Sequence, residues 1–205
     1  MNILKKIIFI LLFLFPVSNS FGAMVTEVQN VEVASGGSNT AVGLHFNTDG
    51  SKMFVLYQGP LDENYNFEWI AYAGSQVAYL RTTGLFKDTN AWYHIVIASD
   101  TDQGTAANRT KMYINGSQVT DFQTENYPSS AAEYKWNDDV VHSIGAFRYS
   151  STVNNFLHAY IAEVINIDGQ QLTPTSFGEF DTDSGIWKPK KIEGLTFGSQ
   201  GFYLN

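Results

Sequence analysis

The stretch from Ala91 to Phe122 constrains the fold of this chain most strongly, because it has the pattern of consecutive antiparallel strands. Trp92 to Ala98 shows the period of two that a strand requires, with apolar residues on both faces, so we expect a strand buried on both sides. Residues 100–108 are Asp, Thr, Gln, Gly, Ala and Asn without a large apolar residue, which is typical of a loop. Asn115-Gly116 predicts a type I′ hairpin turn, because both central positions of that turn need positive φ. The returning strand is expected over Gln118–Phe122.

Short strands with polar connections are predicted along most of the remaining chain. They are expected at Val25–Val33, Ala41–Asn47, Lys52–Gln58, Phe67–Ala73, Val77–Arg81, Val140–Tyr149 and Phe156–Ile167. Thr173-Pro174 is typical of a helix N-cap followed by proline at the first helical position, with Phe177 as the anchor of a single turn near residue 175. We therefore predict an all-β protein in which two antiparallel sheets form a sandwich.

Two segments carry a family resemblance. Trp92-Tyr93-His94-Ile95-Val96-Ile97, followed by Lys111-Met112-Tyr113-Ile114-Asn115-Gly116, resembles the laminin-G-like branch of the concanavalin-A-like lectin and glucanase superfamily. Ala159–Phe180, with Thr182–Pro189 and Gly201–Leu204, is similar to the version found in bacteriophage and marine bacterial proteins. The resemblance covers 67–205 and implies a jelly-roll sandwich. That fold hosts lectins, adhesion modules, hydrolases and structural domains, so the resemblance leaves the function open.

The first 22 residues have the pattern of a secretory signal peptide. Lys5-Lys6 precedes an apolar run from Ile7 to Phe15, and small polar residues follow Pro16. The run is too short to span a bilayer, which needs about 20 residues. Cleavage is expected after Ser20 or Gly22. The mature chain is then secreted, periplasmic or on the cell surface, with no membrane span.

Composition excludes several classes of function. The 205 residues contain no cysteine, so neither a disulfide nor a lipid on an amino-terminal cysteine can hold the exported chain. Loss of Lys5 and Lys6 lowers the count of basic residues from 12 to 10 against 20 acidic ones. A mature net charge of about −10 provides no basic patch for phosphates, and we expect no nucleic-acid partner.

We predict two parts, residues 23–61 and residues 62–205. The boundary between them lies inside the polar connector 59–66. The string Gly43–Gly59 resembles an inner hairpin of a β-propeller blade, but it occurs once, and one repeat cannot close a propeller. It is either a remnant fused to the sandwich or a supplier of strands to the sheets. We predict that the hairpin packs on the sandwich, because so short a segment without cysteine or metal is hard to stabilise alone.

The sequence predicts no enzyme. Retaining glycosidases need two carboxyl groups about 5 to 5.5 Å apart, and Glu163 and Asp168 have an odd offset that places them on opposite strand faces. The four histidines lack metal-ligand spacing, and no Gly-x-Ser-x-Gly motif occurs. A calcium site is the alternative that laminin-G-like relatives suggest, with Asp100, Asp102 and Asn108 as donors, although short polar side chains also serve simply as turn formers.

Aromatic residues divide into two groups. Trp69, Trp92 and Tyr113 lie in alternating strands and are expected in the core. Tyr127, Tyr134 and Trp136 lie in the polar segment 123–139, where a flat ring could stack on a sugar. Because two strand crossings separate this segment from loop 100–108, we expect both at one rim, and the connection beginning at Tyr149 at the other.

Three functions follow in order of preference. The first is an exported, non-catalytic carbohydrate-binding or adhesion module whose partner is a glycan or cell-surface polysaccharide, with Tyr127, Tyr134 and Trp136 as ligand contacts. The second is a structural or assembly domain of a phage-like or cell-surface protein. The third is a laminarinase-like glycoside hydrolase.

Overall fold

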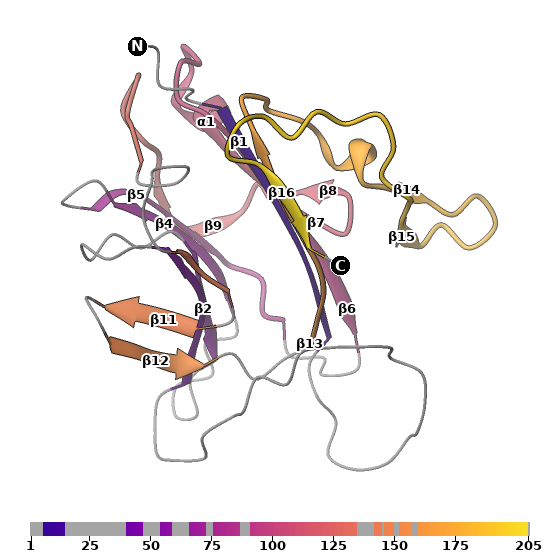
Figure 1. The fold of residues 1–205 in the computed structure, drawn as a ribbon, viewed down its shortest axis with the longest axis horizontal. Coiled ribbons are helices and arrows are strands. Elements are labelled where there is room, and N and C mark those ends of the chain that lie inside the picture. The colour runs from indigo at the N-terminus through magenta and orange to yellow at the C-terminus, as the bar shows by residue number, and fades with distance from the viewer. Residues whose placement is uncertain are drawn as a thin grey trace.

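The described part of the chain is all-β, with antiparallel sheets and very little helix (Figure 1). The computed structural model describes residues 6–14, 40–46, 54–58, 66–72, 76–86, 91–134, 142–144, 146–149, 152–156 and 160–204. Helical structure in these ranges is limited to α1 (Ala106–Arg109) and a single 3-10 turn, η1 (Pro174–Ser176). The predicted turn near residue 175 is thereby confirmed, with Pro174 at its start and Phe177 buried behind it. The α1 turn falls in a segment that we expected to be a loop.

The first sheet has the strand order β16-β13-β1-β6-β7-β8. Its strands are β1 (Lys6–Leu14), β6 (Trp92–Asp100), β7 (Thr110–Ile114), β8 (Ser117–Gln118), β13 (Tyr160–Asp168) and β16 (Phe202–Leu204). The predicted leader segment thus contributes the strand between β6 and β13, with which it pairs antiparallel. Cleavage of residues 1–22 remains a prediction from the sequence.

The second sheet has the order β10-β2-β3-β4-β5-β9. Its strands are β2 (Thr40–Phe46), β3 (Phe54–Gln58), β4 (Phe67–Tyr72), β5 (Gln76–Thr82), β9 (Phe122–Asn126) and β10 (His142–Ser143). Two further hairpins are β11 (Ala146–Tyr149) with β12 (Thr152–Phe156), and β14 (Gly178–Phe180) with β15 (Trp187–Pro189). The predicted strand Val25–Val33 lies outside the described residues.

The two sheets share one hydrophobic cluster, which we call the first cluster. Side chains of β4 and β5, with Trp69 and Leu80 fully buried, meet Ile95, Ile97 and Met112 of β6 and β7. The large rings and branched side chains at alternate positions of these strands explain the packing, because a period of two puts them on one face. This cluster makes the two sheets two layers of one core.

The opposite face of the first sheet carries a second cluster. Val96 and Ala98 of β6 join Ile165 and Ile167 of β13, and Phe177 covers them. Partly buried side chains of the segment 170–204 pack against this group. The strand β6 is therefore buried on both faces, as its sequence predicts.

Two expectations for the central stretch need correction. Trp92 is 44% exposed, because it is the first residue of β6 and lies beyond both clusters. The strand predicted over Gln118–Phe122 is divided: β8 ends at Gln118, and the chain then enters the second sheet as β9, beside β5. The type I′ turn is confirmed, with φ of 48° at Asn115 and 78° at Gly116.

Two further segments that we predicted as connections contain strands. Residues 123–126 belong to β9, and residues 152–155 belong to β12. Their sequences are polar, as at the edge of a sheet, where one face is exposed to water. No helix in the described part of the chain has the length and apolar character needed to cross a membrane.

The hairpin of β14 and β15, which we call the C-terminal hairpin, is attached to the sheets through the ring of Trp187. This ring lies against Gly116 of the type I′ turn and against Gly178, where a Cβ atom would be 2.5 Å from Cζ2 of the ring. His94 of β6 lies beside it, with ring centroids 5.6 Å apart, and Phe180 packs edge-on against it with ring centroids 5.0 Å apart. The rest of the hairpin projects from the body of the protein (Figure 1).

Candidate functional site

Two loops that are distant in sequence form one rim. The amide of Ala131 donates to the carbonyl oxygen of Thr101 at 2.9 Å, and the hydroxyl of Thr101 donates to the carbonyl oxygen of Ala132 at 2.9 Å. Loop 101–109, which follows β6, is therefore joined to loop 127–134, which follows β9. The predicted proximity of these two segments is confirmed, although the chain reaches the second one through the other sheet.

Arg109 holds the rim together. Its Nε donates to the carbonyl oxygen of Gln103 at 2.9 Å. Its terminal nitrogens donate to the carbonyl oxygens of Pro128 at 3.0 Å and Gly104 at 3.2 Å. The planar guanidinium can satisfy several carbonyl groups at fixed angles, which a lysine cannot do. Arg109 therefore fixes the relative position of both loops.

The proposed calcium donors have different environments. Asp100 is 2% exposed, and its carboxylate accepts hydrogen bonds from the amide of Asp102 at 3.2 Å and from the side chain of Gln103 at 2.8 Å. Asp102 and Asn108 are exposed. In the described ranges no group of three or more His, Cys, Asp or Glu side chains is placed to hold a metal ion.

Several oxygen atoms of this loop accept hydrogen bonds from the protein itself. Calcium takes six to eight oxygen ligands, but the carbonyl groups of Gln103 and Gly104 accept hydrogen bonds from a guanidinium. The carboxylate of Asp100 stabilises the turn, which is the role of a short polar residue in a loop. Calcium binding stays a prediction from the sequence, and the geometry of these side chains gives it no support.

Two of the three aromatic residues predicted to contact a sugar, Tyr127 and Tyr134, lie in the described part of the chain, and both pack against the first cluster. Tyr134 packs edge-on against Trp69 with ring centroids 5.7 Å apart, and its hydroxyl lies 3.4 Å from that of Ser99. Burial raises the pKa of Tyr134 to about 12. Tyr127 is half-buried and donates to Glu125 at 2.7 Å, and burial together with this carboxylate raises its pKa. Trp136 lies outside the described residues.

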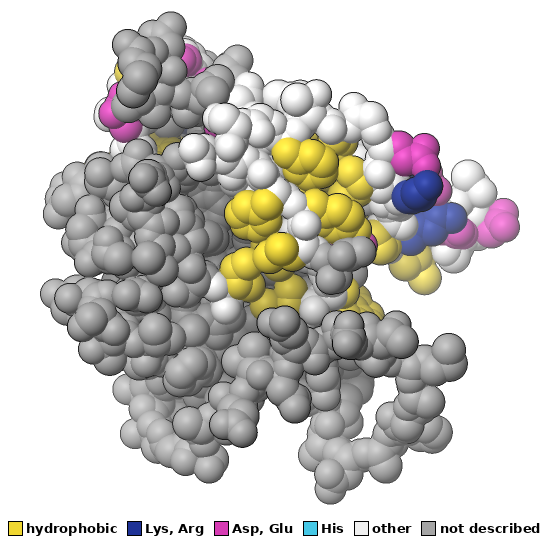
Figure 2. Space-filling view, in the orientation of Figure 1, with side chains coloured by type: hydrophobic (Ala, Val, Ile, Leu, Met, Phe, Trp, Pro, Cys, Tyr) yellow, Lys and Arg dark blue, Asp and Glu magenta, His cyan; other side chains and the backbone are white. Residues whose placement is uncertain are grey.

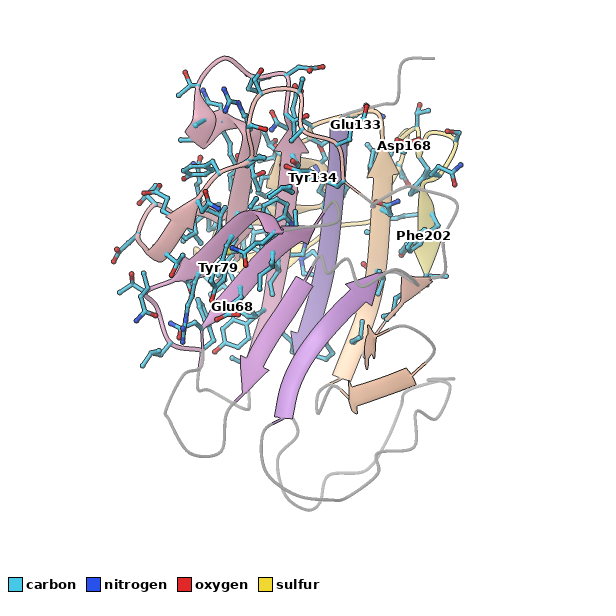
Figure 3. All side chains as sticks on the ribbon, turned by 90° about the vertical axis from the view of Figure 1, so that its left-hand side faces the viewer. Glu68, Tyr79, Glu133, Tyr134, Asp168 and Phe202 are labelled. Carbon is cyan, nitrogen blue, oxygen red and sulfur yellow. The ribbon has the colours of Figure 1, made fainter. Side chains whose placement is uncertain are left out.

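A polar cluster on the second sheet was not predicted. Glu68 of β4 pairs directly with Arg81 of β5, and their side chains form an ion pair at 3.2 Å. Tyr79 donates to Glu68 at 2.9 Å (Figure 3). Asn66 accepts from Arg81 at 3.2 Å. Burial raises the pKa of Glu68, although Tyr79 and Arg81 act in the opposite direction. An acid and a base at equal distances in sequence from Gly74-Ser75 were the signal available before the structure.

This cluster has the composition of a structural ion pair. The cross-strand row through it is Val55, Glu68, Arg81 and Thr124, which contains one acid. A retaining glycosidase needs a second carboxyl group close by, and this row does not supply one. Its described polar contacts join neighbouring strands of the same sheet.

The acids on β13 lie on opposite faces, as their spacing predicts. Glu163 accepts a hydrogen bond from Tyr203 of β16 at 2.8 Å, whereas Asp168 accepts from Ser199 at 3.0 Å and from the amide of Gln200 at 3.3 Å. Both carboxylates therefore stabilise the C-terminal segment.

Comparison with known proteins gives no match: no family model, no curated protein and no solved structure is similar to this chain.

Proposed function

We propose that this protein is an exported, non-catalytic carbohydrate-binding or adhesion module, built as a jelly-roll sandwich of the concanavalin-A-like, laminin-G-like type. The observation that carries the proposal is the rim formed by loops 101–109 and 127–134. A strand-based core with two joined polar loops at one end is the arrangement in which a rigid scaffold presents a binding surface. The ligand class is a glycan or cell-surface polysaccharide.

The rim offers the groups that sugars require. Asp102 and Asn108 expose a carboxylate and an amide, which can accept and donate hydrogen bonds to sugar hydroxyls. Tyr127, which follows β9 in the chain, contributes a half-buried ring. Because Arg109 and Thr101 already hold the loops in place, binding needs little ordering of the backbone, and affinity benefits from that preorganisation.

Binding without catalysis is supported by the distribution of the acids. Glu68 is held by Arg81, Glu163 by Tyr203, and Asp168 by the C-terminal segment. Each of these three acids has a structural partner; Glu68 lies on β4 of the second sheet, and Glu163 and Asp168 lie on β13 of the first.

Trp136→Ala should weaken glycan binding by about 1 kcal/mol or more, which is the scale of a lost aromatic contact. Binding would be measured on a glycan array, with and without calcium, and then by titration with the best ligand. Tyr149→Ala, at the end of β11, is the matched control and should bind as the unmodified protein does. Equal losses in both variants would contradict a binding site at this rim, and an effect of calcium would revive the predicted ion.

A structural or assembly domain is the second candidate, and the projecting hairpin favours it. Phe180 is 53% exposed and Ile186 is 67% exposed, and Lys188 and Asp181 form an ion pair on the same hairpin. Figure 2 shows hydrophobic and charged side chains together on the projecting part of the molecule. Exposed apolar residues on a projecting element are typical of contacts between proteins. A chain that binds no glycan on the array but associates with itself as its concentration rises would support this second function.

A further inference from the structure

The middle position of the first sheet is held by the segment that resembles a removable leader. β1 pairs with β6 along its whole length, from Lys6 opposite Asp100 to Leu14 opposite Trp92. On its other side it pairs with β13, with a shift of register between Leu11 and Phe13. Figures 1 and 3 show β1 between these two strands. Without β1, the order of this sheet divides into β16-β13 and β6-β7-β8.

The register suits a segment that is apolar at every position. The cross-strand partners of Ile8 and Ile10 all belong to the second cluster: Ala98, Val96, Ile167 and Ile165. Those of Leu11 belong to the first cluster: Ile95 and Val164. Directly opposite residues in an antiparallel pair share a face. An uninterrupted apolar run therefore matches the environment on both sides of the sheet, as in strands buried on both faces.

Charge at the end of the strand agrees with this register. Lys6, which belongs to the basic part of the leader pattern, lies directly opposite Asp100, a residue that is 2% exposed. Opposite charges at paired positions favour the pairing. Both the apolar run and its basic flank thus have complementary positions on β6.

Removal of this strand would expose the backbone of its two neighbours. Residues 95–98 of β6 are at most 2% exposed, and Val164, Ile165 and Ile167 of β13 are at most 4% exposed. Buried amide and carbonyl groups need hydrogen-bond partners, and loss of β1 would leave a row of them unpaired on each strand. The folded sheet therefore depends on an occupant at this position.

We propose that Lys6–Leu14 has two mutually exclusive roles: leader of the exported chain and middle strand of the folded chain. A chain that folds before it is processed holds the segment inside the sheet and keeps it. A chain that is processed first folds with an open strand position between β6 and β13. The inference rests on the leader pattern and the sheet register, and it is independent of glycan binding.

Disulfide trapping tests the register in the full-length chain, which has no cysteine of its own. Phe9→Cys is combined with Ile97→Cys, and Ile10→Cys with Val96→Cys. Adjacent antiparallel pairs alternate between narrow and wide spacing, so at least one of these pairs should form a disulfide. Ile10→Cys with Ile97→Cys is the matched control, because these positions belong to opposite faces. No disulfide in either paired variant, or equally fast formation in the control, would overturn the proposal.

Hydrogen exchange tests the same point without changing the core. A protease site inserted after Gly22 allows residues 1–22 to be cut off from the folded full-length chain. Amides of β6 and β13 should exchange about tenfold faster or more once the segment has left, while those of β4 and β5 serve as the internal control. Two other outcomes would also support the strand role. One is unfolding of the whole chain after the cut, and the other is a cut segment that stays bound to the chain in native mass spectrometry. Unchanged exchange in β6 and β13 after the segment has left overturns it.

The rate of cleavage by signal peptidase tests whether the leader role and the strand role of Lys6–Leu14 exclude each other. Purified signal peptidase in detergent should cleave the folded full-length chain at least about tenfold more slowly than the same chain freshly diluted from urea. The reason is that a protease cannot reach a paired strand until that strand opens. Equal rates would overturn the exclusive roles. Secreted protein that lacks residues 1–22 and protects β6 and β13 as fully as the full-length chain would overturn them as well.

Discussion

At the scale of single residues, two glycines and a histidine determine how the C-terminal hairpin attaches. The Trp187 ring fills the space above Gly116 and Gly178, where any Cβ atom would overlap it. The Nε1 of Trp187 and the Nδ1 of His94 are both buried without a hydrogen-bond partner. The contact is therefore one of packing, and it depends on the absence of a side chain at two positions.

Gly116→Ala should destabilise the protein by about 2 kcal/mol or more. Its φ of 78° costs an L-residue about 1 to 2 kcal/mol, and the new methyl group would also displace Trp187. The free energy of unfolding in urea measures the loss. Gly185→Ala is the control, because Gly185 has a similar φ of 68° with open space around it. If both variants lose the same stability, the Trp187 contact contributes nothing.

His94 should make stability fall as the pH is lowered. Burial lowers the pKa of His94 to about 4 from its ordinary value of 6.5. Between these values the unfolded chain binds a proton that the folded chain does not, so the stabilising effect is complete above pH 6.5 and is lost as the pH falls towards 4. The loss is up to about 3 kcal/mol.

Urea unfolding of the unmodified protein and of His94→Leu, each at pH 7 and pH 4.5, would isolate this contribution. Other titrating groups are common to both proteins, so the difference between the two pH dependences belongs to His94. His94→Leu should be less sensitive to acid than the unmodified protein. Identical pH dependences would show that the histidine ionises freely in the folded state.

At the scale of elements, the rim is organised by an arginine clamp between two loops. The segments after β6 and β9 belong to different sheets, and Arg109 and Thr101 join them through backbone carbonyl and amide groups. The four-residue turn α1 places Arg109 at the point where the chain enters β7. The loop is thus an ordered element of the fold.

Arg109→Lys should loosen both loops while it retains the charge. An ammonium group cannot reproduce the planar set of donors, so at least one carbonyl group loses its partner. Hydrogen exchange in residues 101–108 and 128–132 should rise, and glycan binding should weaken by about 1 kcal/mol. Lys191→Arg, at an exposed ion pair with Glu193, is the control and should change neither quantity. Faster exchange without weaker binding would place the ligand elsewhere.

At the scale of the whole molecule, the hairpin of β2 and β3 extends the second sheet. β2 pairs with β3, and β3 pairs with β4, with Phe54 opposite Trp69 and Leu56 opposite Phe67. The division of the chain at residues 61 and 62 stays a prediction, but these pairs describe one continuous sheet across it.

A chain that starts at Asp62 should lose about 2 kcal/mol or more of stability relative to one that starts at Ala23. Removal of β2 and β3 exposes the edge of β4, whose residues Phe67 and Trp69 are fully buried. Thermal and urea unfolding of the two chains would show the difference. Equal stability would mean that residues 23–61 are an independent appendage.

Much of the secondary structure could be predicted from local patterns. β6, β7 and the Asn115-Gly116 turn follow from alternation and from the residues that tolerate positive φ. β9 and β12 were missed because their polar sequences satisfy edge strands and loops equally well. An edge strand is identified by the strand with which it pairs, and the local sequence pattern does not specify that partner.

The candidate site was predictable only in part. The joined position of loops 101–109 and 127–134 followed from the number of strand crossings. The clamp by Arg109 and the pair of Glu68 with Arg81 depend on which strands lie side by side, and composition does not encode that. Tyr134 was expected to face a ligand, yet its ring packs on Trp69, because a polar loop can still place one aromatic residue over the core.

The sequence alone determined the all-β class, the buried β6 strand, the type I′ turn and the single turn at Pro174, because each depends on backbone preferences and side-chain period within a few residues. Tertiary structure decided which strand lies between β6 and β13, where Trp92 and Tyr134 lie, and which loops meet at the rim. Those outcomes depend on pairing across many residues of chain, where hydrophobic burial and hydrogen-bond register select one arrangement among several that the local pattern allows.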